Sequence, residues 1–118
     1  MAEYGEWNQK GATLSEVTAK AEYGVSPEFV IKGIQAGKLE YREGSMHGNP
    51  YLRILRRQLE NYLAEELGQD YLLRAKSQTE LRKLKKEIGS LKKRLEGLQQ
   101  RRNELEASLK PQRRKGSQ

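Results

Sequence analysis

The chain has 118 residues, a net charge of +7 and no cysteine, and 35% of its residues are hydrophobic. This composition supports one small core with an extended element beside it, and it excludes a disulfide framework or a thiolate site. No apolar run approaches the roughly 20 residues that span a bilayer, and no signal-peptide core follows Met1, so we expect a soluble, cytoplasmic protein without a membrane partner.

The first twelve residues lack hydrophobic periodicity, so residues 1–12 are expected to form a mobile arm. Trp7 in this arm either docks on the core or is exposed, and the sequence leaves both open. A first helix is expected to follow the arm and to end near Tyr23, because Gly24 suits the left-handed turn after a helix.

The start of that helix is predicted from a capping box, Thr13-Leu14-Ser15-Glu16. The Thr13 side chain can accept from the backbone N–H of Glu16, and the Glu16 side chain can reach back to the N–H of Thr13. Leu14 and Val17 are then predicted to face the core.

A second helix is predicted to begin directly after the turn. Ser26 is a good N-cap, and Pro27 suits the first helical position, where its missing N–H costs nothing. Val30 and Ile34 form the buried stripe of this helix, and Gly37 ends it.

Two short strands are predicted next, over residues 39–43 and 51–55. The stretch 44–50 between them is dense in turn formers, so the two strands form a hairpin with a loop.

The pattern becomes helical again from about Arg56. Four residues share one face of this helix by the i, i+3 and i+4 rule: Leu55, Leu59, Tyr62 and Leu63. Gly68 weakens the helix by about 1 kcal/mol relative to alanine, so residues 68–70 are a candidate boundary or kink.

A leucine heptad occupies the rest of the chain up to Pro111. Its apolar positions are Leu81, Leu84, Ile88, Leu91, Leu95, Leu98, Leu105 and Leu109, and they alternate in steps of three and four except at Arg102. At 1.5 Å of rise per residue this seam is roughly 40 Å long. These eight residues are predicted to mediate dimerisation, because an isolated stripe leaves apolar area in water at about 25 cal/mol/Å². The alternative is that the stripe folds back on the small domain.

Two such helices can pair in parallel or antiparallel. Both orientations give attractive pairs between flanking charges, which contribute only tenths of a kcal/mol each. A parallel dimer sets Arg102 against its own copy. An antiparallel dimer sets it against the partner's Leu84, where its stem can lie along the seam with the charge outside, so antiparallel pairing is favoured. The mixture of Leu and Ile leaves a tetramer open.

The positive charge is unevenly distributed along the chain. Residues 1–70 hold 8 Lys/Arg and 11 Asp/Glu, whereas residues 71–118 hold 15 Lys/Arg and 5 Asp/Glu. The basic half is either a solvated helix face or a sequence-independent phosphate contact. Residues 111–118 are expected to form a disordered basic tail.

The order of helix, Gly turn, helix, Gly-Lys-Leu, hairpin, Arg-Ile and helix resembles the MerR-like and excisionase-like winged helix-turn-helix proteins over about residues 13–63. The motifs that carry this resemblance are Tyr23-Gly24-Val25-Ser26, Ala36-Gly37-Lys38-Leu39 and Leu52-Arg53-Ile54. It implies that the second helix lies in the major groove of DNA, that the hairpin wing touches backbone or minor groove, and that a C-terminal helix pairs two subunits, antiparallel in MerR-type dimers.

The expected fold class is mainly α, a small winged helix-turn-helix with a two-stranded hairpin followed by a long C-terminal coiled-coil helix. The winged domain would cover residues 13–68 and the coiled coil residues 69–110.

The resemblance places eight residues in contact with double-stranded DNA: Ser26, Lys32, Gln35, Lys38, Arg42, Arg53, Arg56 and Arg57. The cap at Ser26 leaves backbone N–H groups free to meet a phosphate. Lys32 can bind a guanine edge or a phosphate, and Gln35 can pair with adenine. The arginines suit phosphate or a narrow minor groove. Their alternative role is only to solvate a small domain.

Other exposed positions of the second helix are less suited to reading bases. Pro27 and Ile31 offer no side-chain hydrogen bond, and Glu28 suits the positive end of the helix dipole as well as a cytosine amino group. A helix-turn-helix used for protein contact is therefore the alternative.

Catalysis has almost no support. A metal site needs several converging ligands, and a chain with one histidine and no cysteine does not supply them. There is no Gly-rich phosphate loop, and we expect neither an enzyme nor a cofactor. The sequence favours a dimeric DNA-binding protein, either a transcription regulator or a DNA-architecture factor. The second hypothesis is a coiled-coil adaptor whose small domain binds a protein.

Overall fold

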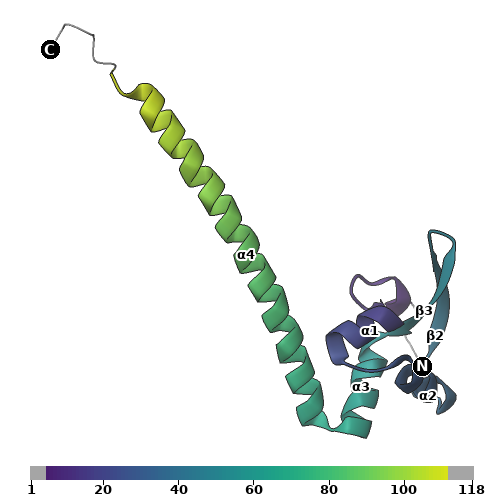
Figure 1. Cartoon of the computed structure of the whole chain (residues 1–118). Coiled ribbons are helices and arrows are strands. Elements are labelled where there is room, and N and C mark those ends of the chain that lie inside the picture. The colour runs from purple at the N-terminus through teal and green to yellow at the C-terminus, as the bar shows by residue number, and fades with distance from the viewer. Residues whose placement is uncertain (1–4, 112–118) are drawn as a thin grey trace, which may run out of the picture. The chain divides into compact units, whose positions relative to one another are not determined.

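The computed structural model describes residues 5–111, and the chain divides into two compact units, one ending at Leu81 and the other beginning at Arg82. The first unit is a small domain of short helices and a three-stranded sheet, and the second is the rest of a long helix (Figure 1). The fold class predicted from the sequence, mainly helical with a small domain before a long helix, is confirmed.

In chain order, the small domain contains a short 3-10 helix, a strand, two helices, two strands and a third helix. The elements are η1 (Glu6–Asn8), β1 (Thr13–Ser15), α1 (Glu16–Tyr23), α2 (Pro27–Gln35), β2 (Tyr41–Met46), β3 (Asn49–Leu55) and α3 (Arg56–Leu67). Helix α4 (Gln69–Leu109) follows after one residue, Gly68, whose φ of 97° breaks the helical path. The break predicted at this glycine is therefore confirmed.

The capping box predicted at Thr13 is wrong. Thr13 and its neighbours form β1, which pairs antiparallel with β3 and sets Leu14 opposite Ile54. Ser15 caps α1 instead, since its side chain accepts a hydrogen bond from the backbone N–H of Thr18. A two-stranded hairpin alone is marginally stable, so the third strand outweighs the local capping preference.

The later start of α1 also changes which residues reach the core. Leu14 is buried as predicted, but Val17 is 79% exposed. Ala19 and Tyr23, which are four residues apart and share one helix face, are buried in its place.

The start of α2 follows the sequence closely. Ser26 caps the helix by accepting from the backbone N–H of Phe29, and Pro27 occupies the first turn. Val30 is fully buried as predicted. Gly33, which the sequence did not single out, is a close-packing point: a Cβ there would lie 2.6 Å from Cδ1 of Leu39.

The sheet has the order β1-β3-β2, with β3 in the centre. The two hairpin strands are longer than predicted, and the loop predicted over residues 44–50 shrinks to a two-residue turn. His47 and Gly48 occupy this turn with φ values of 53° and 83°. Positive φ at both positions fits the primed turns whose twist matches that of the strands. Figure 1 shows this hairpin projecting beyond the helices of the small domain.

The first three turns of α4 belong to the small domain. Leu72, Ala75 and Thr79 are buried there, beside the predicted core face of residues 55–63. The Thr79 hydroxyl donates to the carbonyl oxygen of Glu22 at 2.6 Å, and the Tyr71 hydroxyl donates to that of Tyr23 at 2.7 Å. These bonds satisfy carbonyls at the C-terminal end of α1, which have no partner within their own helix.

The segment expected to be a mobile arm contains η1 in its described part, residues 5–12. Trp7 is docked, with only 6% of its surface exposed. The carbonyl oxygen of Ala12 accepts from the backbone N–H of Arg56 at 2.8 Å, which ties the end of the segment to α3. The expected basic tail lies outside the described residues, except for Pro111.

The seam residues of α4 lie uncovered along the helix. All eight are exposed, from 46% at Leu105 to 80% at Leu109. A long helix with such a row of exposed leucines suggests self-association. Within residues 5–111, no helix is both long enough and apolar enough to traverse a lipid bilayer.

Candidate nucleic-acid interface

The outer face of α2 is the first part of the candidate interface. Its exposed residues are Pro27, Glu28, Ile31, Lys32 and Gln35, and Val30 and Gly33 lie on the opposite, buried side. Neither Lys32 nor Gln35 forms a side-chain hydrogen bond or ion pair within the described part of the chain. Both side chains are therefore available to a ligand.

A short turn fixes α2 against α1. Gly24 adopts a φ of 72°, and Val25 is buried in the core directly after it. A Cβ on Gly24 would lie 3.0 Å from the Tyr71 hydroxyl oxygen, so α4 packs closely against this turn. The turn needs glycine for both its backbone conformation and its close neighbour.

The base of the hairpin wing carries two arginines that face each other. Arg42 on β2 lies directly opposite Arg53 on β3. Arg42 stacks on the Trp7 ring, 4.6 Å from its centroid, and Arg53 donates to the Trp7 carbonyl oxygen at 2.9 Å. Neither makes an ion pair with a carboxylate in residues 5–111.

This pairing is electrostatically unusual. Like charges directly opposite each other on a sheet are destabilising, and among residues 5–111 the partners that offset the repulsion between Arg42 and Arg53 are the Trp7 ring, the Trp7 carbonyl oxygen and the Thr13 hydroxyl, none of them an anion. The site therefore carries two uncompensated positive charges on the wing, which favours an anionic ligand.

Arg56 has a different environment. Its guanidinium lies 2.8 Å from both a carboxylate oxygen of Glu22 and the hydroxyl of Tyr23, and its Nε donates to the carbonyl oxygen of Gly11 at 2.9 Å. Burial lowers the pKa of Arg56, but the bonds to Glu22 and Tyr23 outweigh burial and raise it overall. These three partners tie α3 to α1 and to the N-terminal segment.

The Tyr23 hydroxyl is central to this cluster. It donates to Glu60 at 2.6 Å while it accepts from Arg56. Burial, followed by the hydrogen bond to Glu60, raises the pKa of Tyr23 to about 12 against the opposing effect of Arg56. Tyr23 therefore stays neutral at physiological pH.

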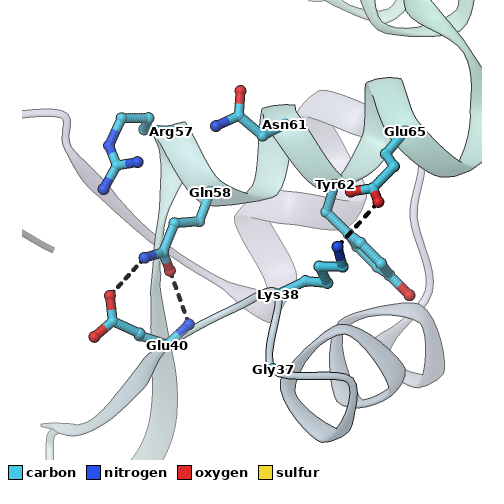
Figure 2. A pocket seen from close by; sticks show the side chains of 8 residues that line it. All are labelled: Gly37, Lys38, Glu40, Arg57, Gln58, Asn61, Tyr62 and Glu65. Atoms are coloured by element: carbon cyan, nitrogen blue, oxygen red, sulfur yellow. Dashed lines mark hydrogen bonds and ion pairs between the residues drawn. The ribbon is translucent and has the colours of Figure 1, made fainter. Parts of the chain in front are cut away.

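Two further candidate cations line a polar pocket of about 370 Å³ between α3 and the segment that leads into β2 (Figure 2). Lys38 pairs with Glu65 at 3.0 Å. Arg57 forms two bonds with Glu6, at 2.9 and 3.0 Å. Both positive charges are thus balanced by carboxylates of the same domain.

Gln58 braces the floor of this pocket. Its side-chain oxygen accepts from the backbone N–H of Glu40 at 2.8 Å, and its side-chain nitrogen donates to the Glu40 carboxylate, as Figure 2 shows. Gln58 is buried, so this pair fixes the start of β2 to α3 rather than offering groups to a ligand.

A second hollow, of about 620 Å³, lies between the start of α1 and the wing. Apolar groups dominate its rim, because Val17 and Met46 are both strongly exposed and Tyr51 lies beside them.

The eight residues assigned to DNA contact fall into distinct groups. Lys38, Arg56 and Arg57 are ion-paired, and Ser26 is engaged as a helix cap. The remaining four have no carboxylate partner among the described residues: Lys32, Gln35, Arg42 and Arg53. Of these, the structure brings only Arg42 and Arg53 directly together.

The sequence did not reveal the role of Trp7. In the structure, Trp7 belongs to the N-terminal segment, and its ring contacts both wing arginines. The sequence also missed Glu6 and Glu22 as partners of Arg57 and Arg56. The presence of a single tryptophan was the only available signal, because all these contacts join residues more than thirty positions apart.

The second unit shows how Arg102 interrupts the seam. Its Nε lies 3.3 Å from a carboxylate oxygen of Glu106, one turn further along the helix. The charge is therefore drawn toward a flanking position, and the aliphatic stem remains available to the seam.

Comparison with family models, with curated proteins and with solved structures finds no match to this chain. Its function is therefore argued from the site itself.

Proposed function

We propose that this chain is a dimeric DNA-binding protein of the MerR-like or excisionase-like winged helix-turn-helix type, a transcription regulator or DNA-architecture factor. The observation that carries the proposal is the facing pair Arg42 and Arg53 on the wing, which has no carboxylate partner among residues 5–111. DNA phosphates are anions that arginine binds through charge-assisted, often bidentate bonds. Lys32 on α2 adds a further unpaired cation.

The connection of α1 to α2 supports the same proposal. The capped start of α2 at Ser26 resembles the second helix of a helix-turn-helix, and its outer face is uncovered by the rest of the small domain. A wing follows directly, so one helix and one hairpin could contact the same duplex.

Dimerisation would use the seam of α4. We favour antiparallel pairing centred near residue 93, because it sets Arg102 against the partner's Leu84 and avoids stacking two arginines. The bond from Arg102 to Glu106 supports this arrangement, since it leaves the stem of Arg102 along the seam.

A salt titration with random genomic duplexes tests the proposal. The logarithm of the binding constant should fall with the logarithm of salt concentration, with a slope near −0.9 per phosphate contacted. Arg42→Gln should flatten that slope by about one. Lys20→Gln is the matched control: Lys20 is an exposed cation of α1 that is assigned no contact, so its loss should leave the slope unchanged. No binding at low salt would contradict the proposal.

The second candidate is an adaptor whose small domain grips a protein. The apolar hollow with exposed Val17 and Met46 favours it, because exposed apolar side chains around a hollow are typical of protein contact. A partner that survives nuclease treatment and is lost with Val17→Ser and Met46→Ser, while Arg42→Gln has no effect, would favour the adaptor over the DNA reader.

A further inference from the structure

The middle of the exposed face of α2 carries no cation. At about 100° per residue, Ile31, Gln35 and Glu28 lie within about 60° of one another near the middle of the exposed arc, and Lys32 lies toward its edge. Ile31 is 43% exposed, so a branched apolar side chain faces water where a groove-reading helix would meet bases.

These two side chains match the two features of an A·T pair in the major groove. Thymine presents a methyl group there, which apolar side chains contact, and adenine presents N6 and N7, which the amide of glutamine can bind together. Ile31 and Gln35 are one helical turn apart, about 6 Å between Cβ atoms, and stacked base pairs are about 3.4 Å apart. The two residues can thus reach neighbouring or next-neighbouring pairs.

We propose that Ile31 and Gln35 are specificity-determining residues that make α2 select A·T pairs, with Ile31 against the thymine methyl and Gln35 on adenine. This inference rests on the proposed DNA-binding function and names the bases that this function would recognise. Both side chains lack partners within the described residues, so reading a base breaks no contact inside the domain.

The charged residues near Ile31 and Gln35 on α2 do not shift the base preference to G·C pairs. Glu28 lies in the first turn, where the positive end of the helix dipole stabilises it. Lys32 lies one turn later at the edge of the arc, where the nearest groups of a duplex would be phosphates. Ile31 and Gln35 are then the two uncharged side chains in the middle of the arc that decide which base is accepted.

Selection from a random duplex library comes first in the test, and the enriched site should contain A·T pairs. Each thymine of that site is then replaced by uracil, which removes only the methyl group. At one position the replacement should weaken binding of the wild-type protein by about fourfold, the expected effect of one buried carbon. Ile31→Ala should bind the thymine and uracil duplexes equally.

The matched control is Val17→Ala, which removes a comparably branched, more exposed side chain from α1. It should keep the full discrimination between thymine and uracil. In the same way, replacing adenine by 7-deazaadenine removes the N7 acceptor, and Gln35→Ala should become insensitive to that replacement.

The outcomes separate this inference from the proposed function. Duplex binding with a steep salt slope, but with no sensitivity to uracil at any position or with discrimination retained in Ile31→Ala, overturns the inference alone. An absence of duplex binding overturns the DNA-binding function and the inference together.

Discussion

The two units of this chain differ in where their side chains find partners. In the small domain, the apolar residues close one core, and Lys38, Arg56 and Arg57 pair with carboxylates of the same domain. From Arg82 onward, every side chain of α4 is exposed, and the ion pairs there join residues of one helix face. The small domain buries its core and pairs these three cations within one chain, whereas the leucine row of α4 stays exposed to water.

Because of this difference, residues of the same type have different roles. A buried leucine in the small domain stabilises the fold, whereas we propose that a leucine in the seam stabilises an assembly. An arginine with a carboxylate partner joins elements of the fold, whereas Arg42 and Arg53 carry positive charge that is available to an anionic ligand. The predictions below test both halves of that contrast.

The largest effect is expected at the seam. Leu91→Asp puts a charge in the middle of the exposed leucine row, so pairing should fail and light scattering should report half the wild-type mass. Ser90→Asp, one residue away on the outward face, is the control and should keep the wild-type mass. An unchanged mass for Leu91→Asp would show that the seam does not mediate assembly.

The next effect concerns the cluster that joins α1 to α3. Arg56→Ala removes the partner of Glu22 and Tyr23, and the free energy of unfolding should fall by about 2 kcal/mol, since hydrogen bonds to charged groups are costly to lose. Urea denaturation measures this change in the free energy of unfolding. Lys32→Ala removes an unpaired exposed cation and should change stability by less than about 0.5 kcal/mol. Equal midpoints for the two variants would contradict the distinction between paired and unpaired cations.

The same cluster predicts a pH dependence. Folding raises the pKa of Tyr23 from 10.0 to about 12, so the folded state holds this proton more tightly than the unfolded chain does. The resulting stabilisation is complete below pH 10 and is lost as the pH rises toward 12. Tyr23→Phe should lower stability at neutral pH, and the difference from wild type should shrink between pH 10 and 12. Tyr41→Phe, which removes a hydroxyl at an exposed site, should leave stability at neutral pH unchanged.

The sequence predicted what depends on near neighbours. The cap at Ser26, the glycine turns, the buried face of α3 and the helix that carries the leucine row all arise from spacings of a few residues, and each is confirmed. It failed at Thr13, where a favourable local cap competes with pairing to a strand forty residues away. A local sequence motif carries no information about the stability gained by pairing with a distant strand.

The candidate site shows the same difference between what local sequence predicts and what depends on distant residues. Which residues are basic is plain from the sequence, but which of them are free depends on Trp7, Glu6 and Glu22, all distant along the chain. The DNA contacts assigned to Arg56 and Arg57 stay predictions, and in the structure both residues already have partners.

The smallest effect is expected from removing the carboxylate partner of an exposed arginine. Glu6→Gln removes the carboxylate partner of Arg57, and because the arginine side of this pair is half exposed, stability should fall by less than about 1 kcal/mol. The released Arg57 could then meet a phosphate, so the salt slope of DNA binding should steepen by up to about one. Glu65→Gln, which releases Lys38 in the pocket of Figure 2, offers a comparison in which a flexible ammonium replaces a planar guanidinium.

If neither release changes the slope while Arg42→Gln flattens it, the phosphate surface is confined to the wing face that carries Arg42 and Arg53. If Glu6→Gln steepens it, the N-terminal segment is a competitor that limits how much of the arginine surface a duplex can use.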